Sequence, residues 1–449
     1  MAERGEFSSR MGFILAAAGS AVGLGNIWGF PTQAASNGGA AYLLVYLTLA
    51  FCLAYPAFVA ELIIGRHARA NAVSALRLIA RGPVSRALGA LTGFAGIVTA
   101  SLILSFYSIV AGWTLGYGLA SLAELGGFDG VAAWLIGFGS ARNLVFSAAF
   151  IMLTAWIISA GVKNGIERWS ARLMPALLLI LLVLIVYVLT LDGATAGLKA
   201  YLIPDFSRAV DLKLIVSALG QSFFSLSLGV GTMLIYGSYV SRSENLPALA
   251  LATTLVDIGV AVTAGLLILP AMYVAEHNGV QIHDAAGRLI SEDMLVFTVL
   301  PALFERMGTT GLFVSMAFFA LMAIAALTST ISMLEVPVAY AVENHGLPRR
   351  RATWAIAAAV SLSSAVIVLN FDQLFGLTIA LTTRYSQPLL GLMFCVFAGW
   401  IWHRDSLLAE IRDGWPDADN SLFWKIWPLY IRYVCPVAIL AVFGNLILA

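Results

Sequence analysis

Long apolar segments separated by short polar loops run along the whole chain. A helix needs about 20 apolar residues to cross a bilayer, and eleven segments reach this length. They lie near 10–35, 40–65, 88–121, 142–161, 172–191, 213–240, 246–275, 309–342, 352–370, 375–402 and 427–447. This pattern predicts an all-α membrane protein with eleven transmembrane helices.

The first apolar segment is interrupted near its centre by small and polar residues. The stretch from Gly19 to Asn26 holds three glycines between long apolar flanks. Unwound backbone at bilayer depth survives only where protein or a cavity satisfies its polar groups. Its free carbonyls can bind a cation and its free N–H groups an anion. We therefore expect the first helix to unwind and form a polar site halfway across the membrane.

The sixth apolar segment is interrupted in the same way, by the hydroxyls and glycines of Gly220 to Gly231. Two breaks five spans apart indicate an inverted five-plus-five repeat with its site at the midplane. Glycine-bearing packing faces between helices are the alternative for each segment. We expect one transporter domain over 1–449, with repeats at about 10–191 and 213–402 and an extra helix at about 427–447.

Composition and charge agree with this assignment and restrict the partners. Hydrophobic residues make up 60% of the 449 residues and charged residues 11%, roughly half the charged fraction of a soluble domain. The net charge of +1 leaves no basic field for nucleic acid. Lysine and arginine gather in alternate loops, such as those after the second, fourth and eighth spans. The positive-inside rule predicts a cytoplasmic N-terminus and, with eleven spans, an outside C-terminus.

Several motifs in these segments are typical of one family of membrane transporters. They are the stretches Gly23–Trp28, Asn37–Ala40, Trp113–Gly116, Gly220–Gly231 and Ala325–Ser329. Together they resemble the neurotransmitter:sodium symporter family, in the eleven-span form of its bacterial LeuT-like members. The resemblance covers essentially the whole chain. It implies a LeuT-type 5+5 inverted repeat with helices 1 and 6 broken, in the bacterial inner membrane.

The resemblance also implies a function. Members of the family use sodium to drive uptake of amino acids or related small molecules by alternating access. We therefore expect sodium-coupled symport of a small neutral amino acid or a similar solute. We also expect two sodium ions, no organic cofactor, and a monomer or weak dimer in the lipid bilayer.

The expected sodium ligands are oxygen atoms, because sodium is a hard cation. By resemblance, one site takes the backbone oxygens of Gly19, Val22 and Ala325 and the hydroxyls of Thr328 and Ser329. From the residues alone, the two hydroxyls can instead bond back to their own helix turn.

The second sodium site, again by resemblance, uses the Ala21 carbonyl, Asn26, Ser225 and a residue of the seventh span. Family members usually have asparagine at that last position, and this chain has Asp257 within an apolar run. An ionisable group at such depth is costly and functional by default. The alternative is a protonated carboxyl or an interhelical hydrogen bond.

Asp257 also affects whether transport is expected to depend on chloride. Chloride-dependent relatives hold a halide beside this site, and some chloride-independent relatives place a carboxylate one turn later, where this chain has Ala261. Tyr46, Gln221 and Ser225 match the rest of the halide cage. Since Asp257 can supply the missing negative charge, we expect chloride independence. It can also favour potassium or carry a proton, which leaves the coupled cation open.

The substrate site is expected between the two breaks. By resemblance, a substrate carboxylate meets the N–H groups of Leu24 and Gly25 and the Tyr107 hydroxyl. Its ammonium group meets carbonyls near Ala21, Phe224 and Ser227. The side-chain pocket is expected to be lined by Ile103, Tyr107, Phe224, Val230, Ser329 and Met333. This apolar set favours neutral substrates, and Gly23 favours amino acids because amine transporters carry an aspartate there.

The outer gate departs from the family. Its usual arginine is replaced by Gly29 and its usual aspartate by Ile379, or by Phe375 if the alignment slips. Loss of both partners together is expected, because a lone buried charge is expensive. Without this ion pair, we expect the outer side of the site to be closed by aromatic side chains or by the loop at 276–308.

The cytoplasmic gate matches the family. Arg4 and Glu343 stand at its two positions, and the alternative is two solvated charges. Glu61, inside the second span, is expected to bond the backbone of the broken helices.

Arg384 is a cationic residue within the tenth predicted span, where relatives usually have short neutral residues. It can neutralise Asp257 or another acid, bind an anionic group on the substrate, or lie near the outer surface. The second alternative would favour an acidic or sulfonate-type amine as substrate.

Other classes of protein fit less well. The chain has no H-E-x-x-H motif and no P-loop, so an enzyme is not expected. A channel would show a polar stripe through several helices, whereas polarity here gathers at one depth. A non-transporting membrane sensor with the same fold is the alternative.

Overall fold

The computed structural model describes residues 5–204, 212–282 and 295–448, and the regular elements in these ranges are all helical. Helices occupy each of the predicted spans. They are α1 with α2 (Arg10–Ala21, Phe30–Ser36), α3 with α4 (Ala40–Leu49, Tyr55–Ala68), α6 (Pro83–Leu125), α8 (Ser140–Ser159), α9 (Arg168–Leu189), α11 with α12 (Leu212–Ser225, Thr232–Gly237), α13 (Leu246–His277), α15 (Gly308–His345), α16 (Arg349–Leu369), α17 with α18 (Phe371–Ile379, Gln387–Val396) and α20 with α21 (Leu422–Leu429, Cys435–Leu448).

Seven of the described helices are long and apolar enough to cross a membrane, and nine if each bent pair counts as one span. One bent pair is the first crossing, where the axis turns by 54° between Ala21 and Gly25. The sixth crossing is built from two shorter pieces, α11 and α12. The protein is therefore an integral membrane protein with interrupted first and sixth crossings.

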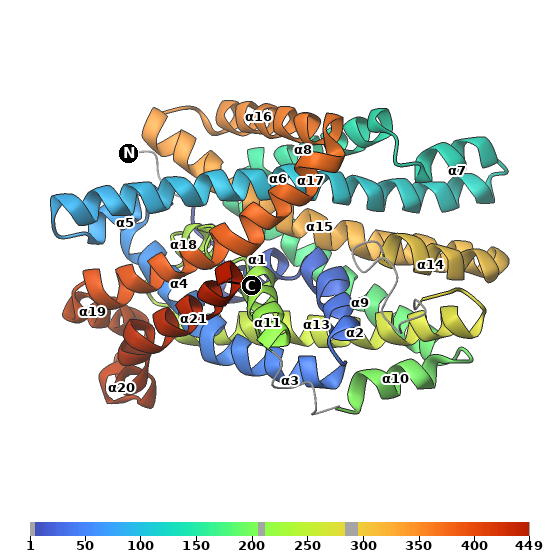
Figure 1. The fold of residues 1–449 in the computed structure, drawn as a ribbon. Coiled ribbons are helices and arrows are strands. Elements are labelled where there is room, and N and C mark those ends of the chain that lie inside the picture. Colours follow the sequence, from blue (N-terminus) through green and yellow to red (C-terminus); the bar gives the residue numbers. More distant parts are fainter. Residues whose placement is uncertain (1–4, 205–211, 283–294, 449) are drawn as a thin grey trace.

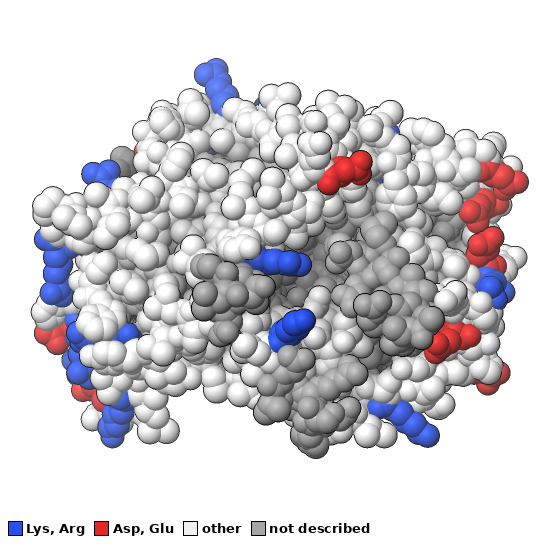
Figure 2. Space-filling model, in the orientation of Figure 1, with Lys and Arg blue, Asp and Glu red and all other residues white. Residues whose placement is uncertain are grey.

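Short helices cover the two ends of the bundle. The long helices run roughly left to right in Figure 1, with α5 (Ala72–Ile79), α19 (Arg404–Gly414) and α20 at the left end. At the right end lie α7 (Asp129–Ile136), α10 (Ala194–Leu202) and α14 (Leu295–Arg306). Figure 2 shows Lys and Arg concentrated at the left end and Asp and Glu mainly at the right. The charge asymmetry of the loops is thus a property of the folded molecule.

The broken helices lie inside a shell of unbroken ones. Helix α1 packs against α9, α13 and α15, while α11 packs against α3 and α12 against α4. Side chains near the first break, such as Ile27 and Phe30, are fully buried. This shell keeps lipid away from backbone groups that lack a helical partner, which is the condition for a break at bilayer depth.

Two features of the backbone explain the break between α11 and α12. Ser227, Gly229 and Gly231 all have positive φ, at 53°, 83° and 81°. A Cβ on Gly229 would lie 2.3 Å from the carbonyl oxygen of Gln387, so only glycine fits this approach. Helix α11 therefore cannot continue into α12.

Two side chains satisfy the backbone that this break exposes. Glu61 Oε1 accepts a hydrogen bond of 2.7 Å from the Gly229 N–H. Gln387 Nε2 donates one of 3.1 Å to the Leu228 carbonyl. The expectation that Glu61 bonds the backbone of a broken helix is confirmed.

Candidate functional site

The two breaks meet at the carbonyl of Ser20. Ser227 Oγ, from the sixth crossing, donates to this oxygen at 3.0 Å. Ser329 Oγ, from α15, donates to it at 3.2 Å. The Ser20 hydroxyl donates in turn to Ser332 Oγ at 2.7 Å. Three crossings are therefore joined at one point of the first break, and Ser20 is a site residue that the sequence reasoning did not single out.

The first set of expected sodium ligands lies together between α1 and α15. Thr328 Oγ1 is 3.5 Å from the Val22 carbonyl oxygen and 3.0 Å from that of Ala325. Gly19 faces the same side chain, because a Cβ there would lie 3.2 Å from Thr328 Cβ. Ser329 follows one residue further on α15, and its hydroxyl donates to the carbonyl of Ser20, the neighbour of Gly19. The Thr328 hydroxyl also donates a hydrogen bond of 3.2 Å to the Ile324 carbonyl in its own helix turn, which is the alternative stated for it from the residues alone.

The second set of expected sodium ligands is centred on Asp257 of α13, which is fully buried. Its Oδ1 accepts from Asn26 Nδ2 at 2.7 Å and from Ser225 Oγ at 3.0 Å, and its Oδ2 is 2.9 Å from Ser225 Oγ. Asn26 Nδ2 also donates to the Asp257 carbonyl at 3.1 Å, and Asn26 Oδ1 accepts from the Gly23 N–H at 3.1 Å. Both breaks and α13 thus share one carboxylate. Ala21, the remaining expected ligand, is buried at the end of α1.

The residues of the expected anion cage surround this carboxylate. Tyr46 is fully buried and lies near Asp257 and Ser225. Gln221 Nε2 donates to the Gly25 carbonyl at 2.7 Å. Ala261, one turn after Asp257 on α13, is also buried. The only carboxylate that the described residues bring to this cage is therefore that of Asp257.

The expected substrate contacts form a tight, closed arrangement. The Leu24 N–H donates to the Tyr107 hydroxyl at 2.8 Å. A Cβ on Gly23 would lie 2.6 Å from this hydroxyl and 2.4 Å from Ser329 Oγ. A Cβ on Gly25 would lie 3.0 Å from the Phe224 ring. Glycine at both positions thus allows tyrosine, serine and phenylalanine side chains to reach the broken backbone.

Apolar side chains continue this arrangement on both sides. Ile103 lies one turn before Tyr107 on α6, and Met333 one turn after Ser329 on α15, so each shares a face with its polar neighbour. Ile103 and Val230 are each 1% exposed and Met333 is 5% exposed. No charged side chain is among the expected pocket residues.

The position of the absent outer gate is filled with aromatic rings. Phe375 packs against Phe371, Trp113 and Phe106, with ring centroids 4.5, 5.8 and 6.3 Å apart. Phe297, from α14 of the outer loop, lies 5.4 Å from Trp113. Gly29 instead faces Gln221, whose Oε1 would lie 3.2 Å from a Cβ there. Both expected substitutes for the gate, aromatic rings and the outer loop, therefore meet at this place.

Trp28 ties this cluster to the first break, because its ring centroid lies 6.0 Å from that of Phe297. It follows the Asn26 ligand position by two residues on the π-helical turn η1 (Gly25–Gly29).

The pair expected to form the cytoplasmic gate is described in part. Glu343 accepts hydrogen bonds from the Asn71 N–H at 2.7 Å and from Asn71 Nδ2 at 2.9 Å. Arg4, its expected partner, lies outside the described residues. The sequence reasoning missed Asn71, although an asparagine before a helix is a common N-cap.

Arg384 is exposed on the π-helical turn η6 (Ala380–Ser386), where Thr382 is buried instead. The hydrogen bonds to Asp257 come from Asn26 and Ser225. Of the three expected positions for Arg384, the structure has the one at the molecular surface. Substrate class therefore has to be judged from the other pocket residues.

Comparison with known proteins agrees with this geometry. The model of the sodium:neurotransmitter symporter family matches residues 4–130 and 130–448. The uncharacterized sodium-dependent transporter YhdH of Bacillus subtilis is 35% identical, over 98% of this chain and 97% of its own length. The uncharacterized sodium-dependent transporter MJ1319 of Methanocaldococcus jannaschii is 30% identical, over 94% and 87%.

A solved structure is similar along the same length. The crystal structure of MhsT in complex with L-phenylalanine superposes with a TM-score of 0.84 at 36% identity, covering 98% of this chain and 99% of the other. The fold is therefore the LeuT-type fold. The chain belongs to the sodium:neurotransmitter symporter family, a family of sodium-dependent membrane transporters and not of enzymes.

Proposed function

We propose that the protein takes up a small neutral amino acid, or a similar solute, by sodium-coupled symport and alternating access. The observation that carries this proposal is the meeting of both broken helices at the Ser20 carbonyl, beside the Asp257 carboxylate. Such a meeting puts unpaired backbone groups, hydroxyls and one negative charge at a single depth. These are the groups that bind a cation and a zwitterion together.

Two sodium ions are proposed as co-substrates. One would be held by the oxygens of Gly19, Val22 and Ala325 with the hydroxyls of Thr328 and Ser329. The other would be held by the second set, Ala21, Asn26, Ser225 and Asp257. The all-oxygen character of both sets favours a hard cation. Among the described residues no group of three His, Cys, Asp or Glu side chains could hold a transition metal.

Chloride independence is part of the proposal. A halide in the cage of Tyr46, Gln221 and Ser225 would lie close to the Asp257 carboxylate, and two like charges at that distance repel strongly in a buried site. The carboxylate therefore takes the place of the anion. Potassium or proton coupling through Asp257 is the second candidate, because the same carboxylate can pair with either cation.

The substrate is proposed to bind by its amino-acid backbone. Its carboxylate would take over the Leu24 N–H and the Tyr107 hydroxyl, which bond each other in the closed arrangement. Its ammonium group would meet carbonyls near Ala21, Phe224 and Ser227. The buried set Ile103, Val230 and Met333 favours an apolar side chain, and the amino acid in the MhsT structure, L-phenylalanine, is of this class.

The placement in the cell is also proposed. The basic end of the molecule, at the left of Figure 2, would face the cytoplasm of a bacterial inner membrane. The N-terminus would then be cytoplasmic and the C-terminus outside. The two repeats, at about 10–191 and 213–402, would rock against each other within one domain, as a monomer or weak dimer.

Uptake into liposomes tests the proposal. The purified chain is reconstituted, and radiolabelled neutral amino acids are offered with an inward gradient of sodium, potassium or protons, in chloride or gluconate. We expect concentrative uptake with sodium in both anions. Equilibration without accumulation would indicate a channel, and binding without uptake would indicate a sensor. Accumulation driven only by potassium or protons would replace the sodium proposal by the second candidate.

A further inference from the structure

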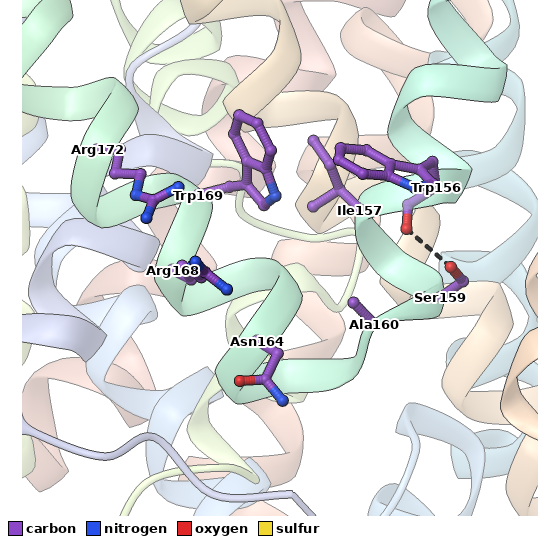
Figure 3. A pocket seen from close by; sticks show the side chains of 8 residues that line it. All are labelled: Trp156, Ile157, Ser159, Ala160, Asn164, Arg168, Trp169 and Arg172. Carbon is purple, nitrogen blue, oxygen red and sulfur yellow. Dashed lines mark hydrogen bonds between the residues drawn. The ribbon is translucent and has the colours of Figure 1, made fainter.

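A pocket of about 390 Å³ opens between the end of α8 and the start of α9, and none of its lining residues belongs to a broken helix (Figure 3). Two consecutive segments line it. The first contributes Trp156, Ile157, Ser159 and Ala160, and the second contributes Asn164, Arg168, Trp169 and Arg172. The proposed transport cycle uses none of these side chains.

The pocket carries positive charge without a nearby counter-charge in its lining. Arg168 and Arg172 lie four residues apart on α9, so their side chains share one face of the helix. No acidic side chain is among the eight lining residues. Glu167, the neighbouring acid, is buried and accepts hydrogen bonds from the Ser8 N–H at 2.9 Å and Ser8 Oγ at 2.5 Å. The pocket therefore selects an anion.

Two tryptophans place this pocket at the level of a membrane surface. The Trp156 and Trp169 rings meet edge to face, with centroids 5.6 Å apart, and Trp156 is 55% exposed. Both rings lie toward one end of the pocket and Asn164 toward the other (Figure 3). Tryptophan is enriched where the headgroups of a bilayer meet its apolar interior, so the arginines lie at headgroup depth.

Apolar surface continues from the pocket along both helices. Met152 and Leu153 on α8 are 51% and 38% exposed, and Leu179 and Leu182 on α9 are 65% and 55% exposed. These side chains offer an apolar surface for acyl chains, further along the two helices than the arginines. A free phosphate ion would gain nothing from them.

We propose that this pocket binds the phosphate headgroup of an anionic phospholipid, with its acyl chains along α8 and α9. The two guanidinium groups pair with the phosphate in the bidentate manner that suits arginine. Asn164 contributes an amide N–H, and the two indoles pack on the glycerol region. Basic pockets between membrane helices are a recurrent form of headgroup site.

Lipid binding also bears on the N-terminus. The π-helical turn η3 (Val162–Glu167) carries Asn164 in the pocket and Glu167 at Ser8. Gly165 holds this turn against α8, because a Cβ there would lie 2.2 Å from the Ile157 carbonyl oxygen. A lipid in the pocket therefore stabilises the segment to which the start of the chain is bonded.

Native mass spectrometry of the full-length protein in detergent tests the proposal. Phosphatidylglycerol, phosphatidylcholine and inorganic phosphate are added separately to the wild type and to the double variant Arg168→Gln/Arg172→Gln. We expect retention of phosphatidylglycerol by the wild type, and roughly 25-fold weaker binding by the variant, from about fivefold per arginine near an anionic headgroup. The melting temperature of the wild type should rise with phosphatidylglycerol alone.

The controls separate the site from general charge and from misfolding. Arg81→Gln/Arg86→Gln removes two exposed arginines, one before α6 and one in its first turn, and should bind like the wild type. Arg168→Lys/Arg172→Lys keeps the charge but loses the bidentate geometry, so its binding should lie between those of the wild type and the glutamine variant. Equal phosphatidylglycerol binding by the glutamine variant would overturn the proposal. Equal saturation by inorganic phosphate would overturn its assignment to a lipid.

Discussion

Asn26 and Asp257 are joined by a hydrogen bond of 2.7 Å although 231 residues separate them in the chain. The bond connects the first break to α13, and Ser225 Oγ connects the same carboxylate to the second break. A negative charge that links three crossings is well placed to sense both the cation and the arrangement of the helices. Replacing it tests the ion dependence of the protein directly.

Asp257→Asn removes the charge and keeps the shape of the side chain. We expect uptake in chloride-free buffer to fall by about tenfold or more, because hydrogen bonds to a charged group, such as those from Asn26 and Ser225, are worth about 1.5–3 kcal/mol each. Addition of chloride should restore part of the uptake if a halide enters the cage of Tyr46 and Gln221. Asp372→Asn, which changes an exposed acid on α17, is the matched control. Wild-type ion dependence in Asp257→Asn would refute the role of this carboxylate.

Gly23→Ala tests how closely the substrate site is packed. The new methyl group would lie 2.4 Å from Ser329 Oγ and 2.6 Å from the Tyr107 hydroxyl. We expect substrate affinity to fall by roughly 5- to 100-fold, the range for overpacking by about 1–3 kcal/mol. Binding is measured by scintillation proximity with radiolabelled substrate.

Gly220→Ala is the control for this variant. It adds the same methyl group to α11, where no atom lies within 4 Å of the new Cβ. Its affinity should match that of the wild type, or rise slightly because alanine favours a helix. Equal losses in both variants would show that glycine as such, and not the space at Gly23, controls binding.

The spans, both breaks and the Asp257 cluster were predictable because each has a local signal. Glycines inside an apolar helix indicate a break, and an acid inside an apolar run indicates a site. The role of the Ser20 carbonyl was not predictable, since it depends on Ser227 and Ser329 arriving from other crossings. The same holds for Gln387, whose amide bonds the Leu228 carbonyl across 159 residues.

The π-helical turns were also missed, and one of them carries Arg384. A π-helical turn adds one residue per turn and rotates every later side chain relative to a regular helix. In η6 Arg384 is exposed and Thr382 is buried, and the sequence alone did not show which face of this segment turns inward. The position of a single residue on a broken helix therefore requires the structure.

Phe297→Ala tests whether aromatic packing has replaced the outer ion pair. Phe297 contacts Trp28, Trp113 and Phe319, with ring centroids 6.0, 5.4 and 6.1 Å away. Loss of a buried phenylalanine costs about 3–5 kcal/mol, so the closed outer side should become less populated.

Labelling of a single cysteine measures this opening. Ile103→Cys, in a chain whose three native cysteines are replaced by serine, is treated with a membrane-impermeant thiol reagent. We expect faster labelling in the presence of Phe297→Ala. The control is Phe313→Ala, which removes a ring that is 57% exposed on α15. Unchanged labelling with Phe297→Ala would show that the outer seal lies elsewhere.

Glu410→Gln tests a buried contact between α4 and α19 at the basic end of the molecule. Glu410 Oε1 accepts from Arg66 Nε at 2.7 Å, and its Oε2 lies 3.0 Å from His67 Nδ1. Burial would raise the pKa of Glu410, but the hydrogen bonds from His67 and Arg66 outweigh burial and hold it below its usual value. We expect the variant to lose about 3 kcal/mol of stability at neutral pH, the low end for one partner of a buried pair.

The pH dependence of this loss follows from the direction of the shift. A carboxyl whose pKa is lower in the folded state contributes its full stability above the unfolded pKa of about 4.3. That contribution disappears as the pH falls through the folded pKa. The difference in melting temperature between the wild type and Glu410→Gln should therefore be present at neutral pH and narrow below about pH 4. Asp405→Asn, at an 87% exposed position on α19, should show no such difference. If the difference in melting temperature stays the same below about pH 4, Glu410 stabilises α19 by its shape and not by its charge.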